Sequence, residues 1–243
     1  MKDAVSRKDE AMKYFITDIH GDCKGLKLLL KHAGVDFSKD QLVFGGDMIN
    51  RGRDSAGVVK EVKALMEKYP ENVHAVIGNH EEMMSWYYER GDRLWLSHGG
   101  RETMQSFQRT FPTEEVRQEH ITWACSLPLY YEDDEFIYTH AGLNPHESLE
   151  RQSREILWME ELDFYSIPKD LLLTATLGKP IVHGHTPVER IYFDGARLNC
   201  DMGSNTYIIE EERGLGLVCL SEMTYWVYKP ALKKIVKRKV MKI

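Results

Sequence analysis

Five segments of the chain place potential metal ligands directly after short apolar runs. In each, a glycine or threonine stands beside an aspartate, asparagine or histidine. The segments are Thr17-Asp18-Ile19-His20-Gly21, Gly45-Gly46-Asp47, Gly78-Asn79-His80-Glu81, Thr139-His140-Ala141-Gly142 and His183-Gly184-His185-Thr186-Pro187. Because ligands collect outside the carboxyl ends of strands in open α/β sheets, we expect these segments to meet at one edge of a sheet.

The donor atoms in these segments belong to carboxylates, imidazoles and one amide, without cysteine. Such nitrogen and oxygen ligands suit manganese, iron or zinc better than copper(I). Asp18 and His20 are two residues apart in an extended stretch, so they point to the same side and can share one cation. Asp47 has two carboxylate oxygens and is the candidate to bridge a second cation. A pair of divalent cations carries a charge that matches a phosphate dianion and clamps the oxygens of an in-line displacement.

Any one of these residues alone is more often structural, as an aspartate that caps a helix or a histidine packed on a sheet. Five occurrences at strand ends reverse that balance. The glycines beside the candidate ligands support the same hypothesis, because backbone must approach the cations closely.

The elements expected to carry the segments alternate between strand and helix in the first third of the chain, which favours a mainly parallel sheet and an α/β fold. The expected strands there are 13–17, 41–44 and 72–77, and the expected helices are 25–32, 55–69 and 80–90. Residues 92–127 are expected to be helical, with a start signal at Pro112-Thr113-Glu114-Glu115. Later strands are expected at 135–139, 179–182, 190–201, 207–210 and within 215–228, with a hairpin turn at Asp194-Gly195.

Composition bounds the class of protein. The chain has 243 residues, of which 42% are hydrophobic and 29% charged, so a disordered or low-complexity chain is excluded and one domain over 1–243 is expected. No apolar run approaches the roughly 18 residues of a membrane helix, and residues 1–10 are too charged for a secretory signal. We therefore expect a cytoplasmic protein without a membrane partner.

The net charge of −6 disfavours tight binding to long nucleic acid, which requires a basic surface. The lysine-rich segment 233–239 is expected to be a solvated terminal strand rather than a nucleic-acid tail. The cysteines Cys23, Cys125, Cys200 and Cys219 lie far apart and are expected to be free thiols.

The ordered motifs identify a family. Asp18-Ile19-His20-Gly21, Gly46-Asp47-Met48-Ile49-Asn50-Arg51-Gly52, Gly78-Asn79-His80-Glu81, His140-Ala141-Gly142 and Gly184-His185 resemble the signature series of the PPP-type serine/threonine phosphatases, within the calcineurin-like metallophosphoesterases. Trp95, Gly99-Gly100 and Thr103 resemble the compact bacterial and phage branch, which includes symmetrical dinucleoside tetraphosphatases. The resemblance spans about 14–205 and implies a central β-sandwich flanked by helices.

The resemblance implies a role for each matching residue. Asp18, His20 and Asp47 would hold a first metal ion, and Asp47, Asn79, His140 and His185 a second. A hydroxide on the metals would attack phosphorus, with His80 as the general acid that protonates the leaving oxygen. Arg51 would grip phosphate oxygens, for which its planar fork of donors is well shaped. The implied cofactors are two divalent ions, with manganese favoured over iron or zinc.

Two positions depart from the family pattern. Asn50 stands where the family has an aspartate that orients and charges the catalytic histidine, and we expect its amide oxygen to accept the bond from His80 instead. The family's second phosphate-binding arginine is missing after Trp158. Arg53, Arg101 or Arg154 could take its place, and His183 is a further candidate for the lining of the site.

The function expected from these residues is hydrolysis of phosphate monoesters by two metals, in the manner of a protein serine/threonine phosphatase acting on a phosphorylated protein or peptide. The alternative is hydrolysis of dinucleoside polyphosphates such as diadenosine tetraphosphate, and a third hypothesis is a weakly catalytic nucleotide sensor. Trp86-Tyr87-Tyr88 could stack a nucleobase but is more typical of helix packing. The remaining histidines are expected at the surface or in packing; they are His32, His74, His98, His120 and His146.

Overall fold

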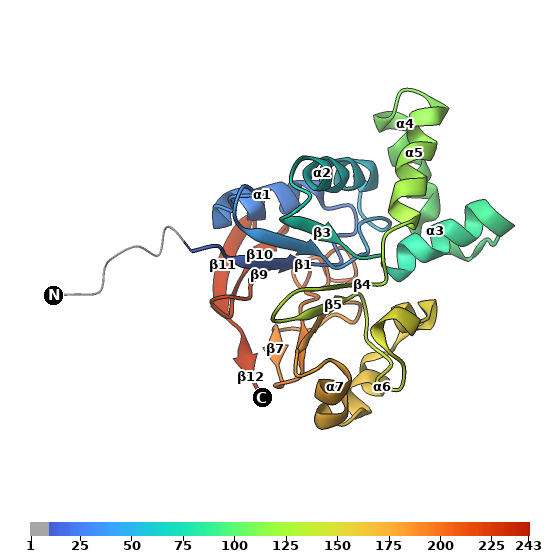
Figure 1. Ribbon diagram of the computed structural model, residues 1–243. Coiled ribbons are helices and arrows are strands. Elements are labelled where there is room, and N and C mark those ends of the chain that lie inside the picture. Colours follow the sequence, from blue (N-terminus) through green and yellow to red (C-terminus); the bar gives the residue numbers. More distant parts are fainter. Residues whose placement is uncertain (1–9) are drawn as a thin grey trace.

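The computed structural model describes residues 10–243 and contains two six-stranded sheets (Figure 1). The first sheet contains β1 (Lys13–Ile16), β2 (Gln41–Phe44), β3 (Val73–Ala75), β9 (Leu215–Cys219), β10 (Thr224–Lys229) and β11 (Lys234–Lys239). The second contains β4 (Tyr130–Glu132), β5 (Ile137–Thr139), β6 (Ile181–His183), β7 (Tyr192–Phe193), β8 (Arg197–Asn199) and β12 (Met241–Lys242). Their orders are β11-β10-β9-β1-β2-β3 and β12-β7-β8-β6-β5-β4.

Apolar side chains fill the space between the two sheets. Phe15 of β1 and Val43 of β2 belong to the same buried cluster as Tyr138 of β5. The rings of Phe15 and Tyr138 lie 5.8 Å apart. The flanking residues of β1, Tyr14 and Ile16, pack on the opposite face, as the two-residue alternation of a strand requires. This layering confirms the expected β-sandwich.

Helices cover both outer faces of the sandwich (Figure 1). They are α1 (Cys23–Ala33), α2 (Ser55–Lys68), α3 (Asn79–Arg90), α4 (Arg101–Thr110), α5 (Glu114–Cys125), α6 (Glu161–Ser166) and α7 (Lys169–Ala175). Short helical turns lie at Leu96–Gly100, Leu149–Arg151 and Arg154–Trp158. Helices α1 and α2 pack on the first sheet, whereas Phe164 of α6 and Leu172 of α7 pack on Ile137 and Ile181 of the second. The flanking helices confirm the expected architecture.

Short polar side chains fix where three helices begin. Asp22 Oδ1 accepts a hydrogen bond from the Gly25 N–H at 2.8 Å, so α1 begins at Cys23, two residues before the expected start. Thr113 Oγ1 accepts from the Val116 N–H at 3.3 Å, which confirms the expected start of α5. Asp54 caps α2 in the same way. Such caps stabilise a helix by about 1 kcal/mol each.

The strand expected at 207–210 is wrong. Residues 204–212 form turns, and the side chains of Ile208 and Ile209 are 93% and 53% exposed. Arg213 Nε donates to the Tyr207 carbonyl at 2.6 Å, so a side chain takes up a backbone acceptor that a sheet would use. Apolar residues form a strand only where a neighbouring strand and a covered face are present, and this segment has neither. Short helices within 149–175 also lie where the sequence predicted no element.

Other expectations for the second half are confirmed. Gly195 has φ +97° in the turn that joins the antiparallel strands β7 and β8. The lysine-rich terminus forms β11, paired with β10. The four cysteines are free thiols.

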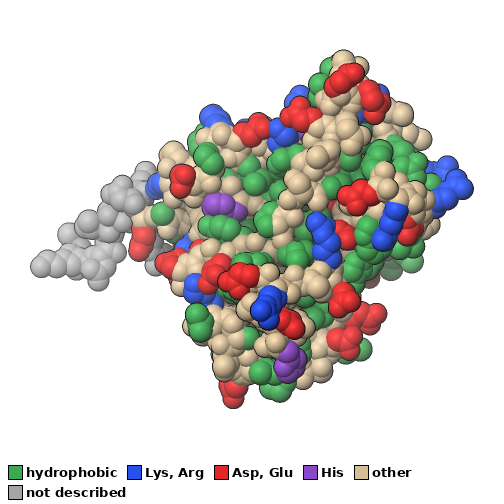
Figure 2. Space-filling view, turned by 45° about the vertical axis from the view of Figure 1, so that its right-hand side comes forward, with side chains coloured by type: hydrophobic (Ala, Val, Ile, Leu, Met, Phe, Trp, Pro, Cys, Tyr) green, Lys and Arg blue, Asp and Glu red, His purple; other side chains and the backbone are tan. Residues whose placement is uncertain are grey.

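The surface is of mixed charge. On the face shown in Figure 2, acidic, basic and hydrophobic side chains of the described residues are interspersed, and no continuous basic area is visible there. Within residues 10–243, no helix is both long enough and apolar enough to cross a bilayer.

Candidate metal centre and active site

Strand ends from both sheets bring the candidate ligands together. Strands β1, β2 and β3 are parallel neighbours in one sheet, and β5 and β6 are parallel in the other. The loops that follow these strands carry Asp18, Asp47, His140 and His185, and Asn79 is the first residue of α3, which follows β3. The His20 N–H donates to the Asp47 carbonyl at 2.9 Å, and the Gly184 N–H donates to the His140 carbonyl at 2.8 Å. The segments meet at the edges of two facing sheets rather than at one edge of a single sheet.

Asp47 lies at the middle of the cluster. Its Oδ2 is 3.6 Å from His20 Nε2, and its Oδ1 is 3.6 Å from His140 Nε2. Each carboxylate oxygen therefore faces a different imidazole, which is the geometry required of a bridging ligand. Burial, and then the negative charge of Asp18, raises the pKa of Asp47 well above its usual range, so a nearby cation would strongly favour its ionised form.

The imidazoles of His20 and His140 are held by the backbone. His20 Nδ1 lies 2.9 Å from the Ile49 carbonyl, and His140 Nδ1 lies 2.9 Å from the Gly45 carbonyl. A carbonyl can only accept, so each Nδ1 carries the proton and each Nε2 presents its lone pair to the centre. A backbone carbonyl of this kind fixes the tautomer of a metal-binding histidine.

Asp18 and His185 complete the ring of candidate ligands. Asp18 Oδ2 accepts hydrogen bonds from the Thr17 hydroxyl at 2.7 Å and the His185 N–H at 3.0 Å. Its Oδ1 remains toward the centre, 4.0 Å from His20 Nε2. Burial lowers the pKa of His185 to about 3, so its ring is neutral and able to ligate. A Cβ at Gly184 would lie 2.2 Å from Asp18 Oδ2, which explains the glycine there.

These atoms form a set that suits cations. Asn79 Oδ1 lies 3.0 Å from His140 Nε2, so two acceptors face each other. With the amide reversed, its NH₂ donates to Asp47 at 3.2 Å and to His140 Nε2 at 3.0 Å, so the acceptors around this position require a hydrogen-bond donor or a cation. Ligand atoms of His20, Asp47 and His80, and of Asp18, Asp47 and His140, lie within 4.8 Å of one another in each trio. The nitrogen and oxygen atoms that converge here are of the types that divalent ions bind.

The backbone at the centre is strained. Ten non-glycine residues among 10–243 have positive φ, and six of them are candidate site residues. The six are Asp18, His20, Asp47, Asn50, Arg51 and His185. Left-handed backbone at non-glycine residues costs about 1–3 kcal/mol each and concentrates at functional sites.

Glu81 holds this strained backbone in place. Its Oε2 accepts from the N–H groups of Asp47 (2.9 Å) and Gly78 (3.0 Å), and its Oε1 accepts from Met48 at 2.9 Å. The side chain is fully buried, and burial raises its pKa to about 7. The motif contains Glu81, but only the structure shows that it holds the backbone of Asp47, the candidate bridging ligand.

The contact between Asn50 and His80 is the reverse of the one expected. Asn50 Oδ1 accepts hydrogen bonds from Trp95 Nε1 at 3.0 Å and the Thr103 hydroxyl at 2.7 Å. Asn50 Nδ2 is therefore the group that faces His80 Nδ1, at 2.6 Å. The expectation that the amide oxygen accepts from His80 is wrong, because the indole N–H can only donate and claims that oxygen.

This contact sets the protonation of His80. Since Asn50 donates to Nδ1, that nitrogen is an acceptor, and the proton of the neutral ring lies on Nε2. A positively charged ring would place an N–H of its own against the Asn50 amide. Burial, and then electrostatic interaction with the His20 ring and the Arg51 guanidinium, hold the pKa of His80 well below its ordinary value. His80 Nε2 lies 3.8 Å from Asp47 Oδ2, so its N–H is at the metal centre.

Arg51 lies at the centre, and Arg53 borders it. Arg51 Nη1 is 2.7 Å from His20 Nε2 and donates to the Thr206 hydroxyl at 2.7 Å. Arg53 is exposed and lines a cavity of about 470 Å³ together with Arg51 and Lys24. The structure thus brings Arg51 next to a candidate metal ligand, while Arg53 lines the adjoining cavity.

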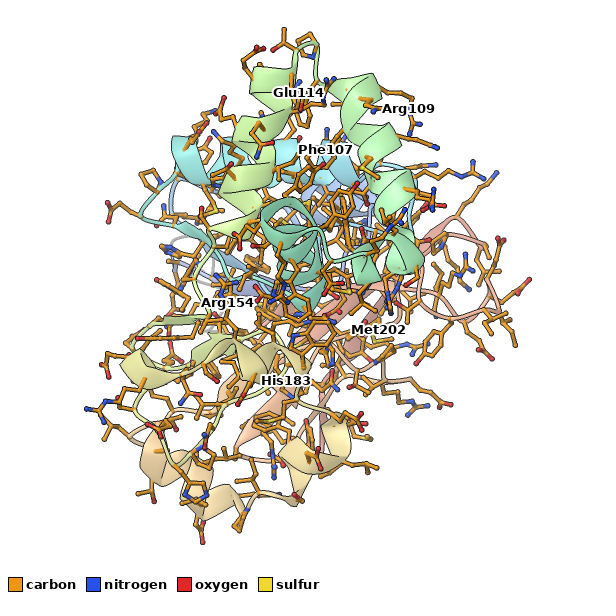
Figure 3. The ribbon with its side chains drawn as sticks, turned by 90° about the vertical axis from the view of Figure 1, so that its right-hand side faces the viewer. Phe107, Arg109, Glu114, Arg154, His183 and Met202 are labelled. Atoms are coloured by element: carbon orange, nitrogen blue, oxygen red, sulfur yellow. The ribbon has the colours of Figure 1, made fainter. Side chains whose placement is uncertain are left out.

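The other two arginines differ in their engagement. Arg154 forms an ion pair with Glu82, whose second oxygen accepts from Trp86 Nε1 at 2.7 Å. Arg101, the first residue of α4, is exposed, and its side chain makes no hydrogen bond or ion pair within residues 10–243. Figure 3 shows Arg154 near the middle of the molecule. Which arginine contacts a second phosphate stays a prediction.

The ring of His183 already has partners. Its Nδ1 lies 3.1 Å from the Gly184 carbonyl, and its Nε2 lies 3.1 Å from the Tyr165 hydroxyl. The ring packs edge-on against Phe164, and the two ring centres lie 5.1 Å apart. His183 is labelled in Figure 3. A substrate contact by His183 stays a prediction, with both ring nitrogens engaged inside the protein.

Most of the remaining aromatic candidates are packing residues. Trp86 stacks on Trp158 at 5.4 Å, and His74 and His120 stack on Tyr131 and Phe111. His98 is exposed, but its ring lies 6.2 Å from that of His80, a proximity that no sequence motif indicates.

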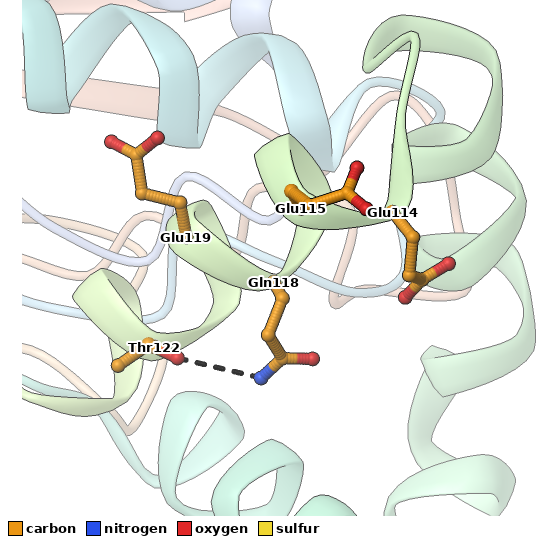
Figure 4. A pocket seen from close by; sticks show the side chains of 5 residues that line it. All are labelled: Glu114, Glu115, Gln118, Glu119 and Thr122. Atoms are coloured by element: carbon orange, nitrogen blue, oxygen red, sulfur yellow. Dashed lines mark hydrogen bonds between the residues drawn. The ribbon is translucent and has the colours of Figure 1, made fainter.

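A separate cavity of about 540 Å³ lies on α5 (Figure 4). Its lining consists of Glu114, Glu115, Gln118, Glu119 and Thr122. None of the candidate ligands lines it, and its three carboxylates would repel a phosphorylated molecule. The chemistry therefore belongs to the buried cluster and not to this cavity.

Comparison with known proteins matches residues 14–219 to the model of the calcineurin-like phosphoesterase family. A symmetrical bis(5'-nucleosyl)-tetraphosphatase of Vibrio parahaemolyticus is 29% identical over 205 residues, or 77% of this chain and 71% of the relative. PrpE, an asymmetrical bis(5'-nucleosyl)-tetraphosphatase of Geobacillus thermodenitrificans, is 27% identical over 77% of this chain and 84% of its own. A protein serine/threonine phosphatase of Saccharomyces cerevisiae shares the fold, with a TM-score of 0.67, 16% identity and coverage of 97% and 81% of the two chains.

Replacing the bridging carboxylate tests the metal centre. Asp47→Asn should lower manganese-dependent turnover of para-nitrophenyl phosphate by roughly a hundredfold or more, because a neutral amide bridges two cations poorly. His185→Asn, at the rim, should lose less. Circular dichroism would verify that both variants fold. Manganese-dependent turnover of Asp47→Asn near that of the unaltered protein would contradict a bridging role.

Restoring the aspartate tests the Asn50–His80 contact. In Asn50→Asp, one oxygen can keep the bonds from Trp95 and Thr103 while the other accepts from a protonated His80. Turnover of an alkyl phosphate should rise by roughly tenfold or more, and that of para-nitrophenyl phosphate much less, since an aryl leaving group requires little protonation. Asn50→Ala removes the donor without adding charge and serves as the control. Equal gains on both substrates would show that residue 50 does not limit proton donation by His80.

Proposed function

The chain belongs to the calcineurin-like phosphoesterases, and from that premise we propose that it hydrolyses the phosphoanhydride bond of dinucleoside polyphosphates such as diadenosine tetraphosphate. The enzyme is a metal-dependent hydrolase, and its family uses two divalent metals. We infer manganese as the metal, the ion that the family resemblance favours; the nitrogen and oxygen donors of the centre also suit iron or zinc.

The observation that carries this proposal is the hydrogen bond from Asn50 Nδ2 to His80 Nδ1. It favours a neutral His80 with its proton on Nε2, which can donate a hydrogen bond but is a weak acid. A phosphorylated nucleotide leaves readily as an anion, whereas the alkoxide of a serine or threonine requires a proton. The site therefore suits an anhydride better than an alkyl ester.

The residues divide the reaction among them. Bound cations would supply positive charge that activates water and screens the phosphate oxygens. The residues that would hold these cations are Asp18, His20, Asp47, Asn79, His140 and His185. Arg51 presents its guanidinium beside them and would bind phosphate oxygens as charge builds up in the transition state. His80 would donate from Nε2 to the oxygen that leaves. One P–O bond forms to water and one breaks, giving two nucleotides.

Cations beside the centre support a substrate with several phosphates. Lys24 and Arg53 line the cavity next to Arg51, and neither forms an ion pair within the described part of the chain. Asp22 and Asp54 also line it, but each carboxylate accepts a backbone N–H as a helix cap. Phosphates beyond the reacting one would meet Lys24 and Arg53 in this cavity.

The second candidate is a phosphatase acting on phosphorylated proteins. The metal ligands and Arg51 suit a phosphate monoester equally well, and the yeast protein phosphatase has the same fold. Asn50 separates the two candidates, because it weakens the proton donor that an alkyl ester needs most.

A substrate panel decides between them. With manganese at saturation, kcat/KM for diadenosine tetraphosphate should exceed that for a phosphoserine peptide by roughly a hundredfold or more, the usual contribution of general-acid catalysis. Chromatography of the products tells central cleavage, which gives two nucleoside diphosphates, from off-centre cleavage. A phosphopeptide hydrolysed as fast as the dinucleotide would establish the second candidate instead. Metal binding without turnover of either would establish the sensor.

Arg53 tests how the additional phosphates are held. Arg53→Ala should raise KM for diadenosine tetraphosphate by roughly two- to fivefold more than KM for para-nitrophenyl phosphate, as expected for an exposed ion pair. Lys31→Ala is the control, because it removes an exposed cation on α1 that lies two turns beyond Lys24 and does not line the cavity. It should change neither KM value. Equal changes in the two KM values for Arg53→Ala would place the additional phosphates elsewhere.

A further inference from the structure

Asp201 is a buried carboxylate with one unpaired oxygen. The residue follows β8 and is 1% exposed. Its Oδ1 accepts the Gly203 N–H at 2.8 Å, but its Oδ2 has no hydrogen-bond partner among the described residues. Burial of an unpaired carboxylate oxygen is costly, so native structures rarely retain one without a reason.

The loop that carries Asp201 packs on the loop that carries the candidate ligands Asp18 and His20. Ser204 Oγ donates to the Ile19 carbonyl at 3.2 Å, and Asn205 Nδ2 donates to the His20 carbonyl at 3.0 Å. Asp18 and His20 lie directly beside these two carbonyls. The pKa of Asp201 is well above its usual range because of burial, and the negative charge of Asp18 raises it further. Asp201 therefore lies within electrostatic reach of the metal centre.

We propose that Asp201 is a third carboxylate of the metal centre, which contributes negative charge to the binding of the cations without standing among the six ligands. Two divalent cations carry more positive charge than Asp18 and Asp47 together neutralise, and a third carboxylate nearby reduces that excess. Without cations the three carboxylates repel one another in a buried space. This role is independent of which phosphoester the enzyme hydrolyses.

A turn-forming role would explain the Gly203 contact. Among the described aspartates, Asp22 and Asp201 each have a buried oxygen without a partner, but Asp22 is only half-buried whereas Asp201 is almost wholly buried. Asp194, in the turn before β8, shows what a purely structural aspartate is like here. It is 7% exposed, and its Oδ1 accepts the Ala196 N–H at 2.9 Å while its Oδ2 accepts from Arg197 Nε at 2.9 Å. Both of its oxygens are paired, so it provides a matched control.

A role in the metal centre and a role in the turn predict opposite effects of a substitution at Asp201 on the stability of the metal-free protein. Asp201→Asn keeps the shape and can keep the Gly203 contact, but it removes the buried charge. Its melting temperature after removal of metal should rise above that of the unaltered protein, and its affinity for Mn²⁺ by calorimetry should fall roughly 10- to 100-fold, the range for residues just outside a metal's ligands. Asp194→Asn should lower the metal-free melting temperature and leave the Mn²⁺ affinity unchanged.

Either of two results would overturn the proposal. One is a fall in the metal-free melting temperature of Asp201→Asn, and the other is an Mn²⁺ affinity within twofold of the unaltered protein. If Asp201→Asn does not fold, Asp201→Ser keeps an acceptor for the Gly203 N–H and allows both measurements. Neither readout requires turnover, so the result stands whichever substrate the panel identifies.

Discussion

The candidate ligand atoms of the metal centre are acceptors that face one another, and the fold must hold them together against their mutual repulsion. It does so with backbone groups. Carbonyls of Ile49 and Gly45 fix His20 and His140, and the His185 N–H fixes Asp18. Because these backbone groups belong to loops at strand ends, the rigidity of the two sheets is transferred directly to the ligand atoms.

Holding the acceptors has an energetic cost that the rest of the molecule offsets. Six left-handed residues and several buried carboxylates destabilise the centre by several kcal/mol in total. Each large apolar side chain buried between the sheets, such as Phe15 or Tyr138, contributes about 1.5–3 kcal/mol in the other direction. Glu81 connects the strained loop to the protein interior, since its buried carboxylate accepts hydrogen bonds from the N–H groups of Asp47 and Met48.

The sequence predicted the parts of the site that depend on local pattern. Asp18, Asp47 and His140 follow apolar strands, and parallel strand ends converge in any such fold. Contacts between distant positions were not predictable in this way. The direction of the Asn50 amide depends on Trp95 and Thr103, 45 and 53 residues away. Asp201 follows a strand that ends in no recognisable motif, and the apolar residues at 207–210 gave no sign that they lacked a partner strand.

The division of ligands between two sheets has a consequence for the whole chain. Loops of the first sheet carry the candidate ligands Asp18, His20 and Asp47, and loops of the second carry His140 and His185, so cations bound by these residues would join the halves of the sandwich. Ions that bind only the assembled halves stabilise them by mass action, by about 2.7 kcal/mol when their free concentration is a hundred times the dissociation constant. The supply of metal in the cell would then regulate the lifetime of the folded enzyme as well as its catalysis.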